Sequence, residues 1–133
     1  MTQWQAAPGS TLLIPSGPSG HHLFILVLGP LAVANYGSMA QVAMVSVTSI
    51  RDGAPHDSAC EIQSGEHPFI DHPSYVAYRY MRIDPEYHVL EMVTKKIWVP
   101  NHPCSAELLS RIVGGVSRSR SISREFKQIF GCL

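Results

Sequence analysis

The sequence predicts an α+β protein that is mainly β, built on a small, strongly bent sheet or barrel with helices at its C-terminal end. Many short apolar and β-branched runs come first in the chain, and two stretches with helical spacing come last. The 133 residues include 10 glycines and 10 prolines, a composition that favours short elements joined by turns. We expect one domain over residues 1–133, with the barrel at about 8–100 and the helical part at about 104–131.

The first half of the chain contains the strongest strand patterns. Residues 10–14 form a short apolar run closed by a proline, and residues 22–28 and 41–50 are longer β-branched runs. The last of these alternates and ends in Thr48-Ser49, where side chains become accessible. Residues 51–58 then form a turn.

Strand patterns continue after this turn. A short strand is expected at residues 60–62, and a polar loop follows at residues 63–73. Residues 75–83 alternate again, Asp84-Pro85-Glu86 predicts a hairpin, and residues 87–99 predict one or two further strands. The sheet therefore extends to about residue 100.

Two helices are expected after this point. Ser105 is a candidate N-cap with Glu107 in the first turn, and apolar residues follow on one face. A second short helix starts at Ser121 or Ser123 and stops at Gly131.

Charge is distributed unevenly along the chain. Residues 1–50 contain no Asp, Glu, Lys or Arg, residues 51–91 contain eight acidic and three basic residues, and residues 92–133 contain seven basic and two acidic residues. The basic end is a candidate surface for polyanions. The alternative is that it docks on the acidic middle of the same chain.

Cysteine usage and hydropathy predict a cytoplasmic protein. The three cysteines, Cys60, Cys104 and Cys132, are odd in number and do not form a disulfide framework pattern. The first ten residues lack a basic segment, and the apolar run at residues 23–34 is broken by Gly29-Pro30. Neither a signal peptide nor a membrane span is expected.

A metal site is not expected, although potential ligands gather in one region. Their spacing matches no HExxH or paired CxxC motif, so we predict neither a metal nor another cofactor. The five potential ligands are His56, Asp57, Cys60, His67 and His72.

The stretch from Gly65 to Arg79 is the best candidate for chemistry. His67 and His72 each precede a proline that stiffens the loop, and histidine transfers protons near neutral pH. Cleavage of an RNA phosphodiester needs a base, an acid and a cation, and Arg79 or Arg82 is a candidate for the cation. The substrate-contacting candidates in this stretch are His72, Ser74 and Tyr78.

A structural explanation of the same residues is the alternative. His67 and Tyr78 would then anchor the loop to the barrel, while Arg79 would pair with Glu66 or Asp71. Further along the chain, Arg118 and Arg120 lie in a basic segment with a nearby aromatic, a composition that suits RNA phosphates and bases. A solvent-exposed helix connection explains that segment equally.

The layout of the chain resembles the PemK/MazF-type toxin barrels. HLFILVLGP resembles the R-P-x-x-V-L-S-P strand of that family, and VAMVSVTS resembles its V-x-x-x-P-I-T-S strand. Ser74 and Val76 resemble its serine–valine run, and Arg82-Ile83-Asp84 resembles its closing R-T-I-D. The stretch GEHPFIxHxSYVxYR also resembles a set of uncharacterised bacterial proteins.

The resemblance implies a small SH3-like barrel that forms a homodimer, pairs with a small antitoxin protein and cleaves single-stranded RNA without a metal. Thr48 or Ser49 matches the family's hydroxyl position, whereas its arginine falls on His21 or His22. Arg79 or the histidines would take the role of that arginine, and His67 or His22 would transfer protons. The alternative function is a non-catalytic module on the same barrel that binds protein or nucleic acid.

Overall fold

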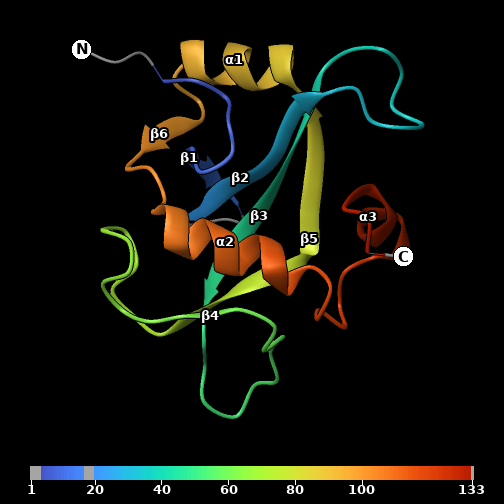
Figure 1. The fold of residues 1–133 in the computed structure, drawn as a ribbon. Helices are drawn as coiled ribbons and strands as arrows, with labels where there is room; N and C mark the ends of the chain where they lie inside the picture. Colours follow the sequence, from blue (N-terminus) through green and yellow to red (C-terminus); the bar gives the residue numbers. More distant parts are fainter. Residues whose placement is uncertain (1–3, 17–19, 133) are drawn as a thin grey trace.

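The computed structural model describes residues 4–16 and 20–132, which form a sheet with three short helices (Figure 1). Each element is short, as expected for a chain rich in glycine and proline. In chain order the elements are β1 (Thr11–Pro15), β2 (His21–Leu31), β3 (Gln41–Ser49), β4 (Glu61–Ile62), β5 (Ser74–Pro85), α1 (Glu86–Thr94), β6 (Val99–Asn101), α2 (Ala106–Gly115) and α3 (Arg124–Ile129).

The strands form one antiparallel sheet in the order β4-β5-β3-β2-β1-β6. The sheet is curled into a half-barrel, and its two outer strands are the shortest ones. Between β3 and β5 the register shifts, so that residues 78–81 bulge from the ladder between the pairs Ser46–Ala77 and Met44–Arg82. A bulge of this kind bends the strand and redirects its side chains.

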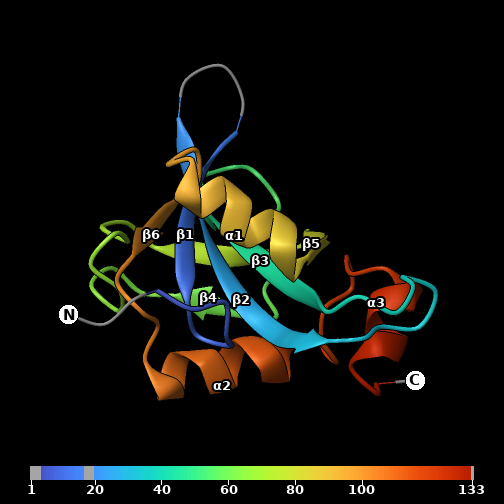
Figure 2. The ribbon, with the colours of Figure 1, turned by 90° about the horizontal axis from the view of Figure 1, so that it is seen from above.

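Each face of the sheet is covered by a different helix, as Figures 1 and 2 together show. Alternate residues of a strand point to opposite faces, so Ile25 and Val45 pack beneath α2, whereas Phe24 and Met44 pack beneath α1. The α2 face also receives α3 and the segment before it. Two apolar layers, one on each face, therefore stabilise the half-barrel. Neither helix covers the polar end of the sheet, where β3 ends and β5 begins.

The strand predictions over the first half of the chain are confirmed to within a few residues. β1, β2, β3, β4 and β5 overlap the predicted strands, and β5 begins at Ser74 and continues to Pro85. The prediction for residues 84–99 is wrong, because Asp84-Pro85-Glu86 is no hairpin and the following residues form α1. Val89, Met92 and Val93 recur at helical spacing and pack against the sheet, so only Val99–Asn101 remains as a strand.

Both predicted C-terminal helices are confirmed. The Ser105 side chain accepts a hydrogen bond from the Leu108 N–H, and the Ser123 side chain accepts one from the Phe126 N–H, so each serine is an N-cap. Gly131 follows α3 with a φ of 73°, a conformation that suits glycine. Within residues 4–16 and 20–132, no helix is both long enough and apolar enough to cross a membrane.

Candidate functional site

The polar loop before β5 is fixed at its centre by His67. The ring is only 1% exposed, its Nε2 lies 2.6 Å from the His102 carbonyl oxygen, and its Nδ1 accepts a hydrogen bond of 3.0 Å from the Phe69 N–H. This pattern assigns the proton to Nε2, which donates to the carbonyl. Both ring nitrogens are therefore occupied by backbone groups, and His67 anchors the loop.

A salt bridge joins the same loop to α2. Arg111 binds both carboxylate oxygens of Glu66, at 2.5 and 3.1 Å, and donates a third hydrogen bond to the Glu61 carbonyl. The hydrogen bonds from the Arg111 guanidinium to the Glu66 carboxylate lower the pKa of Glu66. Glu66 thus pairs with Arg111 and not with Arg79, the partner that the sequence suggested.

The environment of His67 predicts a loss of stability in mild acid. Burial lowers the pKa of His67 below the ordinary value of 6.5, so the unfolded chain binds a proton that the folded chain rejects. The free energy of unfolding should fall as the pH drops from about 6.5 toward the lower pKa of the folded state. His67→Gln, which keeps a donor toward the His102 carbonyl, should remove this dependence in urea unfolding at pH values between about 6.5 and 5. An unchanged pH dependence in the variant would contradict the assignment.

A cleft of about 490 Å³ lies at the polar end of the sheet, and we name it the histidine cleft. Its volume falls in the range of small-molecule sites, roughly 300–1,000 Å³. It brings together five residues predicted from the sequence: His22, Thr48, Ser49, His72 and Ser74. Eight further residues line it as well, among them His21, Arg51, Phe69 and Asp71.

Strand order explains how the histidine cleft is arranged. β3 lies between β5 and β2, so Thr48 and Ser49 at the end of β3 lie between His72, just before β5, and His22 in β2. Antiparallel pairing brings the end of β3 to the start of both neighbours. Thr48 and Ser49 point to opposite faces of the sheet as consecutive strand residues, and both line the cleft between the two histidines.

Each imidazole has one polar neighbour at Nδ1. His72 Nδ1 lies 2.5 Å from an oxygen of Asp71, and the His72 side chain is 64% exposed. His22 Nδ1 is hydrogen-bonded to the Ser16 hydroxyl. Among residues 4–16 and 20–132, neither Nε2 has a hydrogen-bond partner. Ser74 differs from these residues, because it is buried and its hydroxyl donates to the His72 carbonyl at 2.9 Å. It positions the loop from beneath the cleft.

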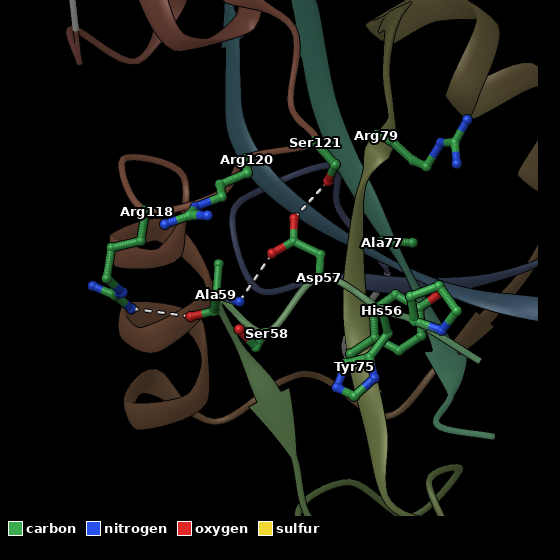
Figure 3. Close-up of a pocket in the computed structure, with 11 residues that line it drawn as sticks. His56, Asp57, Ser58, Ala59, Tyr75, Ala77, Arg79, Arg118, Arg120 and Ser121 are labelled. Carbon is green, nitrogen blue, oxygen red and sulfur yellow. Dashed lines mark hydrogen bonds between the residues drawn. The ribbon is translucent and has the colours of Figure 1, made fainter. Parts of the chain in front are cut away.

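A second cleft of about 870 Å³ lies along the outer side of β5, and we name it the arginine cleft (Figure 3). Beyond Tyr75 this side of β5 pairs with no described strand, so the loop at residues 55–59 and the segment after α2 form the other walls. It contains three residues predicted from the sequence: Arg79, Arg118 and Arg120. His56, Asp57 and Tyr75 are the additional side chains with clear chemical capacity.

Asp57 fastens the walls of the arginine cleft to each other. One of its oxygens accepts hydrogen bonds of 2.5 Å from the hydroxyls of both Ser119 and Ser121, and the other accepts one from the Ala59 N–H. Burial alone would raise the pKa of Asp57, but these hydrogen bonds outweigh burial and lower it. The carboxylate therefore stays ionised and holds the arginine-bearing segment in place.

Three predicted site residues lie in neither cleft: His67, which anchors the loop as described above, Tyr78 and Arg82. Tyr78 is fully buried, and its hydroxyl donates to the Ile112 carbonyl at 2.6 Å; burial raises its pKa, so it stays protonated. Arg82 binds Asp84 through two hydrogen bonds of 2.7 and 2.9 Å and lies over the Trp98 ring on the α1 face. Tyr78 joins β5 to α2, and Arg82 joins β5 to the segment after α1.

The candidate metal ligands are dispersed. His56 bonds to Glu61, Asp57 holds two serines, and His67 faces the backbone. In the described part of the chain, no three His, Cys, Asp or Glu side chains form a group that could hold a metal ion.

Burial raises the pKa of Cys104 to about 11, so its thiol is protonated at neutral pH.

Sequence reasoning missed Arg51 as a residue of the histidine cleft. Arg51 follows the end of β3 directly, but Arg51-Asp52-Gly53 is typical of a turn. Arg51 was therefore predicted to contribute only to the charge of the chain. Its position two residues after Ser49 is the feature that identifies it, since a cation close to two hydroxyls at a strand end is suited to an anion.

Comparisons of the chain with protein-family models, with curated proteins and with solved structures found no match.

Proposed function

We propose that this protein is a metal-independent endoribonuclease that cleaves single-stranded RNA in the histidine cleft. The observation that carries the proposal is the strand order, which places the end of β3, with Thr48 and Ser49, between His72 and His22. Phosphodiester cleavage by an adjacent hydroxyl requires a base and an acid on opposite sides of phosphorus. Arg51 adds the positive charge that such a reaction needs.

In the proposed reaction His72 acts as the base. Its free Nε2 takes the proton of the ribose 2′-hydroxyl while the 2′-oxygen forms a bond to phosphorus. The bond from phosphorus to the 5′-oxygen breaks, and protonated His22 donates a proton to this leaving oxygen. The products are a 2′,3′-cyclic phosphate and a new 5′-hydroxyl, and Thr48, Ser49 and Arg51 hold the non-bridging phosphate oxygens.

The PemK/MazF-like resemblance supports the same location. In this proposal the half-barrel is the SH3-like barrel of the toxins, and Thr48 or Ser49 takes the family's hydroxyl position. His21 or His22 stands in place of the family arginine, and Arg51 supplies its charge from just after the neighbouring strand β3, at the same end of the sheet. A homodimer and a small antitoxin partner are implied by the resemblance alone.

The purified protein should cleave single-stranded RNA in the presence of a chelator. Products should carry a 2′,3′-cyclic phosphate, because the 2′-hydroxyl is the nucleophile, and 2′-O-methyl RNA should remain intact. Gel analysis of end-labelled oligonucleotides, with mass spectrometry of the product ends, tests both expectations. Binding without any cleavage would reject the enzyme and favour a non-catalytic nucleic-acid-binding module.

A further inference from the structure

The arginine cleft adjoins the histidine cleft at the β3–β5 ladder. Thr48 lines the histidine cleft, Tyr75 lines the arginine cleft, and the two are direct partners in the β3–β5 ladder. Residues directly opposite each other in an antiparallel pair point to the same face, with Cβ atoms about 4.5–5.5 Å apart. The side chains of Thr48 and Tyr75 are therefore neighbours, and the two clefts meet at this pair.

The arginines of this cleft are available to a ligand. Arg79, Arg118 and Arg120 are exposed, and within the described residues no carboxylate lies within 4.0 Å of them. Arg118 has one long hydrogen bond, 3.3 Å, to the Ala59 carbonyl. Figure 3 shows Arg118 and Arg120 on one side of β5 and Arg79 on the other. Unpaired guanidinium groups around a concave surface suit phosphate oxygens.

Asp57 lies between these arginines, but its lone pairs are engaged. It accepts two serine hydroxyls and one backbone N–H, and Ser119 and Ser121 alternate with Arg118 and Arg120 along the chain. Binding of both serines by Asp57 therefore fixes the segment that carries Arg118 and Arg120. Asp57 thus joins the two walls of the cleft, and of the three arginines only Arg118 adds a hydrogen bond between these walls, the long one to Ala59, among the described residues.

Two rings provide a surface for a base. The rings of Tyr75 and His56 have centroids 5.1 Å apart, and both side chains are half-buried. His56 Nε2 lies 2.6 Å from a Glu61 oxygen, which fixes the ring plane beside Tyr75. Stacking on a fixed aromatic surface tolerates any base.

We propose that the arginine cleft binds a second nucleotide of the same RNA strand, next to the nucleotide in the histidine cleft. Its base stacks on Tyr75 and His56, and the phosphates that follow contact Arg118 and Arg120. This inference rests on the proposed function for the identity of the strand, because the histidine cleft holds the scissile phosphate. The ligand is thus a single-stranded RNA segment that spans both clefts.

Binding is tested with a 2′-O-methyl RNA oligomer of about twelve nucleotides, which lies within the site sizes known for single-strand binders. This probe resists cleavage, so fluorescence anisotropy reports binding alone. Arg118→Gln/Arg120→Gln should raise Kd about tenfold or more and reduce the slope of log K against log salt by about 1.4, the value for two lost phosphate contacts. Tyr75→Ala should raise Kd about fivefold or more.

The matched control is Arg124→Gln/Lys127→Gln, which removes two positive charges from α3 and leaves the cleft intact. Its Kd should change less than threefold. An equal loss in the control, or unchanged binding in Arg118→Gln/Arg120→Gln, overturns the proposal. Circular dichroism of each variant shows whether the fold is retained, and Tyr75→Ala tests the same cleft without altering charge.

Cleavage kinetics separate this inference from the proposed function. Arg118→Gln/Arg120→Gln should leave kcat/KM for a dinucleotide unchanged and lower kcat/KM for an octanucleotide about tenfold, because only the longer substrate carries the phosphates that follow the second nucleotide. An equal decrease for both substrates would place these arginines at the scissile phosphate and overturn the inference. If no RNA is cleaved but the binding results are as expected, the enzyme fails and the nucleotide-binding cleft stands.

Discussion

Replacing His72 with alanine is expected to lower kcat for RNA cleavage by about 10²–10⁴-fold, the usual contribution of general acid–base catalysis. His72 has its Nδ1 at 2.5 Å from Asp71 and its Nε2 free, so the variant loses the group that accepts the 2′-hydroxyl proton. KM should change little, since the phosphate is held by Thr48, Ser49 and Arg51. Single-turnover cleavage of an end-labelled oligonucleotide measures the effect.

Two companion variants make this prediction specific. Asp71→Asn should lower kcat less than His72→Ala, because it disturbs the orientation of the imidazole without removing it. His102→Ala is the control, since His102 is an exposed histidine outside the histidine cleft. Equal loss in His102→Ala, or full activity in His72→Ala, would show that His72 is not the base.

The strands and the C-terminal helices were predictable because local chemistry determines them. Residues 22–28 and 41–50 are rich in β-branched and apolar residues over a full strand length. Side chains of this kind pack well against the neighbouring strands of a sheet. Ser105 and Ser123 mark helix starts through their own side chains, which cap the first free N–H groups. Patterns of this kind do not depend on distant residues.

α1 was missed because its local pattern is ambiguous. Tyr87 and Val89 alternate as in a strand, Val93 and Thr94 are β-branched, and Asp84-Pro85-Glu86 has the composition of a turn. What selects the helix is burial of Val89 against the α1 face of the sheet. That contact depends on Trp98 and the N-terminal residues, which are separated from it in sequence.

The histidine cleft brings together residues that the sequence singled out separately. Thr48 and Ser49 were predicted at a strand end and His72 in the polar loop, and all three line the cleft. The roles of His67 and His72 could not be distinguished, because both precede proline in the same loop. Which ring turns inward is decided by the His102 carbonyl, 35 residues later in the chain.

Gly115→Ala is expected to destabilise the fold by about 1–3 kcal/mol, the usual cost of an overpacked core. A Cβ at this position would lie 2.2 Å from the Tyr78 hydroxyl and 3.0 Å from the adjacent ring carbon. Tyr78 cannot withdraw, because it is fully buried and its hydroxyl donates to the Ile112 carbonyl. The clash exceeds the gain of about 1 kcal/mol that alanine brings to a helix. Chemical denaturation measures the change.

The neighbouring glycine and a double variant isolate the cause. Gly114→Ala should be neutral or stabilising, because its Cβ would meet only the Arg118 guanidinium at 3.8 Å. In a Tyr78→Phe background, which lacks the nearest clashing atom, Gly115→Ala should cost less than in the wild type, with a coupling of about 1 kcal/mol. If the stability losses of Gly115→Ala and Tyr78→Phe were simply additive, the two residues would not be in contact. The end of α2 leads directly into Arg118 and Arg120. The contact between Gly115 and Tyr78 therefore sets the position of the arginine cleft as well as the stability of the fold.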